Sequence, residues 1–237
     1  MNDLIDTTEM YLRTIFELQE EGVPPLRARI AERLEHSGPT VSQTVARMQR
    51  DGLLHIPDGR EIELTETGKA AAARVMRKHR LAECLLVDVV GLPWEQAHAE
   101  ACRWEHVISN DVEVRLLDVL DHPTTSPFGN PIPALTELDP AVTTDPARAG
   151  SALWEVATDE VLLVRVSAVD EAVQSDPSLI TAFHRIGLSP GGLVKCRRND
   201  ENVLVGSAGE YAEVPESLAK HIVVSPTRAE EANADRG

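Results

Sequence analysis

The sequence has few cysteines, few aromatic residues and no long apolar segment. Phe, Trp and Tyr together make up 3% of its 237 residues. No stretch of about 18 or more apolar residues occurs, so we expect no membrane-spanning helix. Cys84, Cys102 and Cys196 are too few and too scattered for a disulfide framework, which favours a reducing, cytoplasmic environment. The acidic first residues lack the apolar core of a signal peptide, so we do not expect secretion.

Charge is distributed unevenly along the chain. The net charge is −16, of which residues 1–80 contribute −1 and the remaining residues −15. Residues 25–50 contain five arginines against two glutamates. Because local charge governs contact with phosphates, whereas the total charge governs non-specific attraction, the N-terminal third is compatible with DNA binding. The acidic remainder should weaken indiscriminate binding.

The N-terminal third has the pattern of a winged helix. We expect three helices and two strands, bounded at 7–20, 26–35 and 40–50 for the helices and at 53–57 and 60–65 for the strands. Ser37-Gly38-Pro39 predicts a tight turn between the last two helices, and Asp58-Gly59 predicts a hairpin turn between the strands. A helix-turn-helix followed by a hairpin is typical of DNA-binding proteins. The alternative is a winged helix that contacts only protein.

The start of the third helix carries side chains suited to DNA. Small hydroxyl groups reach phosphates, Gln43 can read a base edge in the major groove, and arginines anchor the backbone. We expect DNA contacts from Arg27, Ala28, Arg29, Ser37, Pro39, Thr40, Ser42, Gln43, Thr44, Arg47, Arg50 and Arg60.

Cys102, Glu105 and His106 form the most distinctive motif. On a helix, a thiol, a carboxylate and an imidazole at this spacing project from one face. Ligands of such different softness suit a divalent transition metal. Further ligand-type residues at helical spacing are His98, one turn earlier, and the pair His79 and Glu83. The alternatives are an incidental surface cluster for the first group and a solvated ion pair for the second.

The rest of the chain predicts helices and then strands. We expect helices over 67–90, 94–108 and 110–120, a Pro-rich segment over 121–149, and a small β-barrel with one helix at 177–186. The barrel strands are expected at 160–168, 193–198, 202–205, 211–214 and 222–224. Leu116, Leu117 and Leu120 are candidates for a dimer surface, unless they build the core of the helical domain.

Five strings of the sequence strongly resemble the diphtheria-toxin-repressor family (DtxR/IdeR) of iron-dependent regulators. They are Asp6–Ile15, Pro25–Leu34, Ser37–Val45, Met76–Glu83 and Glu100–Val107, and the close match covers about residues 1–135. The resemblance implies a mainly α fold with a small β part: an N-terminal winged helix-turn-helix, a helical metal-binding and dimerisation domain, and a C-terminal SH3-like β-barrel. The expected bounds are 1–73, 74–140, a linker at 141–150, 151–226 for the SH3-like domain, and a flexible tail at 227–237.

The resemblance also implies function and site residues. It implies an Fe²⁺-activated repressor of iron-uptake and siderophore genes, binding a palindromic operator as homodimers, two dimers per operator, with two metal ions per chain. The implied primary site is Met10, Cys102, Glu105 and His106. The implied ancillary site is His79, Glu83, His98, Glu171 and Gln174. The implied anion site beside it is Arg80, Ser126 and Asn130.

The chemistry of the primary ligands favours Fe²⁺. Sulfur ligands select against Mg²⁺, Ca²⁺ and Mn²⁺, while Co²⁺, Ni²⁺, Zn²⁺ and Mn²⁺ remain possible substitutes in vitro. A Mn²⁺-responsive repressor is the runner-up. Taken alone, Met10 fits plain core packing, and Glu171 and Gln174 fit an exposed turn. Met10 lies in the first helix and its partner ligands in the helical domain, so one ion bound by all of them would tie the two domains together.

Other classes of protein fit the sequence less well. A metal-dependent hydrolase needs an open coordination position and a general base, and we find no Ser/His/Asp constellation or phosphate-binding glycine loop. We therefore do not expect an enzyme. A metal buffer would leave the winged helix unexplained.

Overall fold

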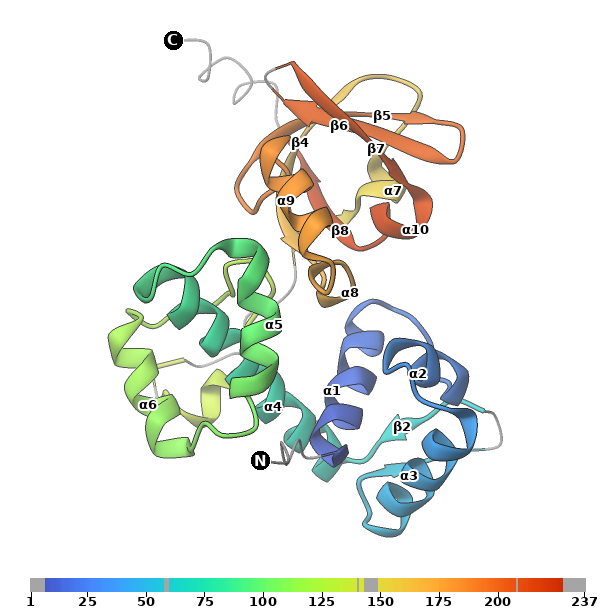
Figure 1. Ribbon diagram of the computed structural model, residues 1–237, viewed down its shortest axis with the longest axis vertical. Helices are drawn as coiled ribbons and strands as arrows, with labels where there is room; N and C mark the ends of the chain where they lie inside the picture. Colours follow the sequence, from blue (N-terminus) through green and yellow to red (C-terminus); the bar gives the residue numbers. More distant parts are fainter. Residues whose placement is uncertain (1–6, 58–59, 140, 143–148, 208, 228–237) are drawn as a thin grey trace. The chain divides into compact units, whose positions relative to one another are not determined.

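Helices α1 (Thr7–Glu20), α2 (Arg27–Arg33) and α3 (Gly38–Arg50) begin the computed structural model, which describes residues 7–57, 60–139, 141–142, 149–207 and 209–227 (Figure 1). The predicted helix-turn-helix is confirmed. Helix α3 begins two residues before the expected Thr40, because the Ser37 hydroxyl caps it by accepting a hydrogen bond from the Thr40 backbone N–H. Pro39 lies in the first helical turn, where its missing N–H costs nothing.

The wing is a short antiparallel hairpin of β1 (Leu54–His55) and β2 (Glu63–Leu64). Both strands are shorter than predicted, and the expected Asp58-Gly59 turn lies outside the described residues. Helix α4 begins immediately after the hairpin, where Gly68 is required for packing. A Cβ atom there would lie 1.9 Å from the Leu53 carbonyl oxygen.

One apolar core joins these elements. Helix α1 contributes Tyr11, Ile15 and Leu18, which follow the spacing of a helical face. Helix α3 contributes Val41, Val45 and Met48, which are all fully buried.

The next helices are α4 (Glu66–Cys84), α5 (Trp94–Trp104) and α6 (Asn110–Val119). The helix predicted over 67–90 changes at residue 85 into a π-helical turn, η1 (Leu85–Val89). The helix predicted over 94–108 ends at Trp104, where the Val107 N–H bonds to the Trp104 carbonyl three residues back. No helix in the described part of the chain combines the length and apolarity that crossing a membrane requires.

Arg77 fixes α4 to two other segments. Its Nε lies 2.8 Å from Glu113 Oε1 on α6, and both side chains are buried. Its Nη1 donates to the Ala134 carbonyl oxygen at 2.7 Å and to Glu137 Oε2 at 3.0 Å. Ala134 precedes the 3-10 turn η2 (Leu135–Glu137) and has a left-handed backbone, with φ at 53°. Leu116 and Leu117 of α6 are buried in this chain, so they are core residues and not the exposed dimer surface that we considered.

The C-terminal part is an antiparallel sheet in the order β3-β8-β4-β5-β6-β7 (Figure 1). Its strands are β3 (Ser151–Ala152), β4 (Leu162–Val169), β5 (Leu193–Asn199), β6 (Asn202–Ser207), β7 (Glu210–Pro215) and β8 (Ile222–Pro226). The helices between them are α7 (Leu153–Val156), α8 (Glu171–Gln174), α9 (Pro177–Arg185) and α10 (Glu216–Ala219). The five predicted strands and the predicted helix are confirmed, whereas β3, α7, α8 and α10 were not predicted. The pairings of the described strands leave β3 and β7 as edges.

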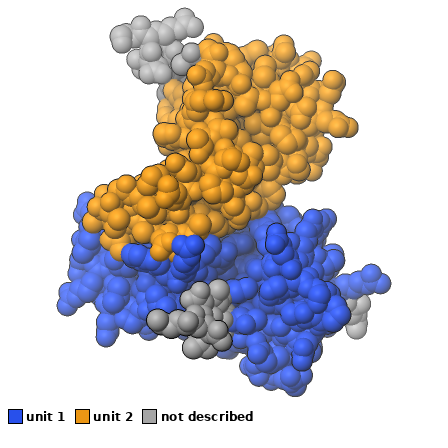
Figure 2. Space-filling view, in the orientation of Figure 1, with its two compact units in different colours: residues 1–82, 101–122, 132–145 blue, residues 83–100, 123–131, 146–237 orange. Residues whose placement is uncertain are grey.

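Two compact units are distinguished by their internal contacts (Figure 2). Unit 1 is residues 1–82, 101–122 and 132–145, and unit 2 is residues 83–100, 123–131 and 146–237. Helices α4 and α5 each run from one unit into the other.

Within unit 2, segment 123–131 packs tightly on the sheet. Phe128 is fully buried and stacks on Trp94 of α5, with ring centroids 4.6 Å apart. The Val169 N–H of β4 donates to the Phe128 carbonyl oxygen at 2.9 Å. Gly129 has φ at 82°, and a Cβ atom there would lie 2.0 Å from the Ser167 carbonyl oxygen. The sheet is therefore attached to the start of α5 and not only tethered by the linker.

Candidate metal centres and DNA-facing surface

Cys102, Glu105 and His79 bring three different ligand types together within unit 1. One ligand atom of each lies within 4.8 Å of those of the other two. Cys102 lies on α5, whereas Glu105 and His106 follow in the turn after Trp104. The prediction that all three residues project from one helical face therefore holds only for Cys102, because the helix ends before Glu105. The Glu105 N–H still bonds to the Ala101 carbonyl oxygen four residues back, which keeps its side chain near that of Cys102.

Glu105 is the centre of this group. Its side chain is fully buried, and its Oε2 lies 2.7 Å from Nδ1 of the buried His79. His106 Nε2 lies 3.3 Å from Oε1 of the same carboxylate. Burial by itself raises the pKa of Glu105, but Arg13, His79 and His106 outweigh burial and hold that pKa below its usual range. Glu105 is therefore a carboxylate, the form that binds cations.

Helix α1 supplies a cation and an anion to the same group. Arg13 Nη1 lies 3.1 Å from Cys102 Sγ and 2.9 Å from Glu105 Oε2. Burial lowers the pKa of Arg13, but the charges of Glu17, Cys102 and Glu105 raise it by more, so the guanidinium stays charged. Glu9 Oε2 lies 2.6 Å from His106 Nδ1, and this hydrogen bond raises the pKa of His106 above its usual value, against the effect of burial.

Met10, the fourth implied ligand, lies on α1 one turn before Arg13. It is half-buried and packs against the core of the winged helix. The Thr14 hydroxyl donates to its carbonyl oxygen at 2.9 Å. Met10 therefore occupies the helix that carries Glu9 and Arg13, both of which contact the implied ligands.

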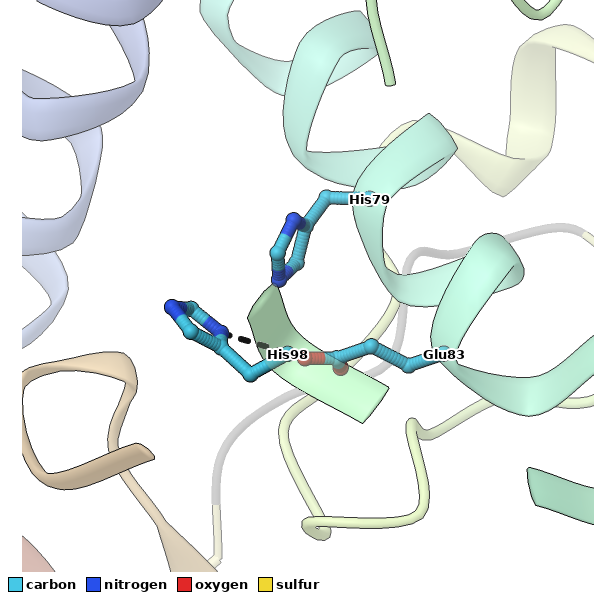
Figure 3. A group of neighbouring side chains, drawn as sticks. All are labelled: His79, Glu83 and His98. Atoms are coloured by element: carbon cyan, nitrogen blue, oxygen red, sulfur yellow. Dashed lines mark hydrogen bonds and ion pairs between the residues drawn. The ribbon is translucent and has the colours of Figure 1, made fainter. Parts of the chain in front are cut away.

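A second group consists of His79, Glu83 and His98 (Figure 3). His79 and Glu83 are one turn apart on the continuous helix α4, and Figure 3 shows both side chains leaving it on the same side. His98 comes from α5, and its Nδ1 lies 3.4 Å from Glu83 Oε1. All three are buried, so the solvated ion pair considered for His79 and Glu83 is wrong. Two imidazoles and a carboxylate are ligands that suit first-row transition metals.

Glu171 and Gln174, the implied partners of this second group, lie on α8 and are also buried. Their burial rules out the exposed turn considered for them. Gln174 Nε2 and Asn130 Nδ2 both donate to the Val169 carbonyl oxygen, at 2.7 Å and 2.8 Å. The two amide oxygens are buried and accept no hydrogen bond from the described residues. Buried acceptors of this kind call for a donor or a cation, so the residues present fit a metal ion.

The residues implied for the anion are engaged elsewhere. Arg80 is buried and its Nη2 lies 2.5 Å from Glu20 Oε2 of α1. The Ser126 hydroxyl accepts from the Phe128 N–H at 3.2 Å. Asn130 presents an oxygen and not an N–H, an arrangement that favours a cation over an anion.

The predicted DNA-contacting residues form an exposed surface around α3. Ser37, Pro39, Thr40, Ser42 and Gln43 are all exposed at its start. A pocket of about 280 Å³ is lined by Gln43, Thr44, Arg47 and Arg50 together with Thr7 of α1. Among the remaining predicted residues, Ala28, Arg29 and Arg60 are exposed and Arg27 is half-buried.

Comparison with known proteins accounts for the presence of both ligand-type clusters and a helix-turn-helix surface in one chain. Residues 3–60 match the family model of the iron dependent repressor N-terminal DNA binding domain, and residues 65–134 match that of the iron dependent repressor metal binding and dimerisation domain. The iron-dependent repressor IdeR of Mycobacterium leprae (strain TN) is 56% identical over 227 residues, which cover 94% of this chain and 99% of the relative. The chain belongs to the iron-dependent repressor family.

Two further proteins show how far the likeness extends. The diphtheria toxin repressor of Corynebacterium diphtheriae is 50% identical to this repressor over 222 residues, which cover 94% of this chain and 98% of that protein. A solved manganese-dependent transcriptional repressor in complex with manganese superposes with a TM-score of 0.78 at 27% identity, over 93% of this chain and 100% of that one. The chain is thus a metal-dependent transcriptional repressor and not an enzyme, as predicted.

Sequence reasoning missed two residues of this repressor that contact the implied metal ligands, Glu9 and Arg13. Both face partners about 90 positions away in the chain. The available signal was their place on the helix of Met10: Arg13 is three residues later and so shares part of its face. Tyr11, which is fully buried, was also missed as a core residue.

Proposed function

We propose that Fe²⁺ is the physiological effector of this repressor, with two ions per chain. Met10, Cys102, Glu105 and His106 would hold the first ion, and His79, Glu83, His98, Glu171 and Gln174 the second. The observation that carries the first ion is the convergence of the Cys102 thiol on the buried Glu105 carboxylate, which His106 Nε2 contacts at 3.3 Å. A bound ion supplies positive charge and fixed coordination there.

Ligand chemistry separates Fe²⁺ from the runner-up, Mn²⁺. Cys102 and Met10 are sulfur ligands, which manganese binds weakly, whereas Fe²⁺ accepts mixed sulfur, nitrogen and oxygen ligands. Mn²⁺ remains the alternative effector, because a manganese-dependent repressor has the same fold. Co²⁺, Ni²⁺ and Zn²⁺ are expected to substitute in vitro, since they follow Fe²⁺ in the order of increasing affinity.

Activation follows from where the ligands lie. Met10 is on α1 of the winged helix, whereas Cys102 is near the end of α5 and Glu105 and His106 lie in the turn that follows it. When these residues bind one ion, α1 is held in one orientation relative to the helical domain. Two winged helices of a dimer must be spaced to meet successive major grooves, so ligand binding selects the orientation that fits DNA.

The DNA complex proposed here is a palindromic operator bound by homodimers, two dimers per operator. The surface of α3 would enter the major groove, with Gln43 reading bases and Arg47 and Arg50 anchoring phosphates. Val107, Val112, Val114 and Val119 are large apolar residues exposed on or beside α6, and we assign them to the dimer surface in place of the buried Leu116 and Leu117; Leu120 is half-buried. The regulated genes would be those of iron uptake and siderophores, and the protein would act in the cytoplasm.

An anion site remains part of the proposal. Arg80 and Ser126 would hold the anion, with Asn130 joining after a half-turn of its amide, which exchanges Oδ1 and Nδ2. Arg80 would then leave Glu20, its partner in this structure.

An anaerobic titration of full-length protein tests the assignment. Fluorescence anisotropy of a labelled palindromic duplex is followed against free Fe²⁺ and, separately, free Mn²⁺. We expect Fe²⁺ to activate binding at the lower concentration, and activation by Mn²⁺ at equal or lower concentration would overturn the iron assignment. With Co²⁺, a thiolate charge-transfer band should appear in the wild type and be lost in Cys102→Ser but kept in Cys196→Ser. Retention of the band in Cys102→Ser would refute the primary site.

By linkage, operator DNA must tighten metal binding by the factor by which metal tightens DNA binding. We expect a coupling of about 1–3 kcal/mol, the range typical of an effector and its partner. Equal Co²⁺ affinities with and without the duplex would show that the ion does not select the DNA-binding orientation.

A further inference from the structure

Arg13 occupies the space between two of the proposed metal ligands. Its Nη1 lies 3.1 Å from Cys102 Sγ, 3.1 Å from Glu105 Oε1 and 2.9 Å from Glu105 Oε2. A guanidinium nitrogen only donates, so Cys102 and Glu105 direct their electron pairs at one cationic atom. A metal ion bound by the same two residues would take the same electron pairs.

The Arg13 guanidinium also contacts a carboxylate outside the proposed metal site. Arg13 Nε lies 2.9 Å from Glu17 Oε1, one turn further along α1. Arg33 binds the same acidic surface, with Nη1 3.5 Å from Glu17 and Nη2 2.7 Å from Glu21. Arg13 can therefore give up its contacts with Cys102 and Glu105 and keep a carboxylate partner. Its side chain is 16% exposed, so an arginine without such a partner would be costly to hold there.

We propose that Arg13 is an internal cation that competes with the metal ion for Cys102 and Glu105 and thereby sets the metal concentration at which the repressor is activated. This inference rests on the proposed function, because it needs the primary site. An arginine is always charged, so the competition is built in at every physiological pH. In this structure the guanidinium lies 2.9 Å from Glu105 Oε2 and neutralises that carboxylate. In the loaded chain it must move away, because a divalent ion and a guanidinium repel each other at that distance.

The competition predicts tighter metal binding when the internal cation is removed. We expect Arg13→Gln to bind Co²⁺ at least tenfold more tightly than the wild type in a DNA-free anaerobic titration, equivalent to about 1.4 kcal/mol. Arg13→Lys, which keeps the charge, should stay close to the wild type. Arg33→Gln is the matched control: it removes a cation from the same acidic surface without touching Cys102 or Glu105, and its Co²⁺ affinity should be unchanged. Unchanged or weaker binding by Arg13→Gln would overturn the proposal.

A second measurement uses the wild type and does not depend on a variant that folds. Nitrogen-15 NMR of the Arg13 guanidinium, titrated with diamagnetic Zn²⁺, should show a shift that saturates with one ion at the Cys102 site. The Arg33 guanidinium serves as the internal reference and should stay near its starting position. A stationary Arg13 signal at saturation would refute the exchange. The Co²⁺ charge-transfer band of Cys102 distinguishes failure of the proposed function from failure of this inference. If the wild type shows no band, the primary site is refuted. If the band appears but the Arg13 signal is stationary, only this inference is refuted.

Discussion

Replacing Glu113 by glutamine should destabilise the helical part of unit 1 strongly. Glu113 is fully buried, and its carboxylate pairs with Arg77, whose side chain is 2% exposed, at 2.8 Å. Removing one partner of a buried ion pair costs about 3–5 kcal/mol, because the other charge is left in a medium of low polarity. Arg77 keeps the Ala134 carbonyl oxygen and Glu137 as acceptors. We therefore expect the lower end of that range, about 3 kcal/mol.

Urea unfolding of the metal-free full-length chain measures this loss, monitored by far-UV circular dichroism. A thermal scan should show the transition of unit 1 lowered by roughly 6–12 °C, at about 2–4 °C per kcal/mol for a chain of this size. Asp111→Asn is the matched control, because it neutralises an exposed acid on the same helix and should change stability by less than about 0.5 kcal/mol. A loss below about 1 kcal/mol for Glu113→Gln would refute the reasoning that Arg77 depends on it.

Three further changes test other parts of the structure. The hydrogen bond from Arg74 is the main cause that lowers the pKa of Glu137. The stability that this carboxylate contributes is therefore present above the ordinary carboxyl pKa and is lost as the pH falls through the lowered pKa. Urea midpoints of Glu137→Gln should accordingly depend less on pH below about 4.5 than those of the wild type. Gly129→Ala should cost at least about 1–3 kcal/mol in unfolding of unit 2, because its φ is 82° and the new Cβ would meet the Ser167 carbonyl oxygen; wild-type stability would contradict this. Arg47→Ala should weaken operator and random duplexes alike and lower the salt slope by about 1, and a loss confined to the operator would assign Arg47 to base reading instead.

Much of the winged helix could be predicted because its signals are local. Ser37-Gly38-Pro39 predicted the turn between the two helices, and the structure differs only in using Ser37 as the cap, so that α3 begins at Gly38 and not at Thr40. Tyr11, Ile15 and Leu18 form the buried face of α1, and Tyr11 is the member that a count of apolar residues omits. An amphipathic aromatic residue such as tyrosine gives a weak signal in a count of apolar residues.

Changes of helical type were not predictable from the same patterns. The chain from 66 to 89 is helical throughout and has helical periodicity, but the hydrogen bonding widens at Leu85 into a π turn. Turns of this kind are rare and occur mostly as single turns within α-helices, so helical periodicity gives no signal for them. The early end of α5 at Trp104 was not predictable either, and it changes the site because it places Glu105 and His106 in a turn.

The proximity of Cys102 and Glu105 could be predicted from the sequence, whereas their contacts with Arg13 could not. Spacing brings Cys102 and Glu105 together because both lie within one turn of the same segment. Their partner Arg13 is 89 residues away from Cys102, and on α1 the series Glu9, Arg13 and Glu17 has the spacing of an ordinary solvated helix face. Only the tertiary fold distinguishes a face that meets water from one that meets a ligand set.

Glu105 shows why such a site needs internal partners. A buried carboxylate without a cation would be driven to its neutral form, which binds metal ions poorly. Arg13, His79 and His106 keep it ionised before any ion arrives, and they reach it from α1, from α4 and from its own turn. A ligand that is stable in both states must therefore exchange one set of cationic partners for another. On the exchange proposed above, an activating ion would replace the contacts of Arg13 on α1 with Cys102 and Glu105.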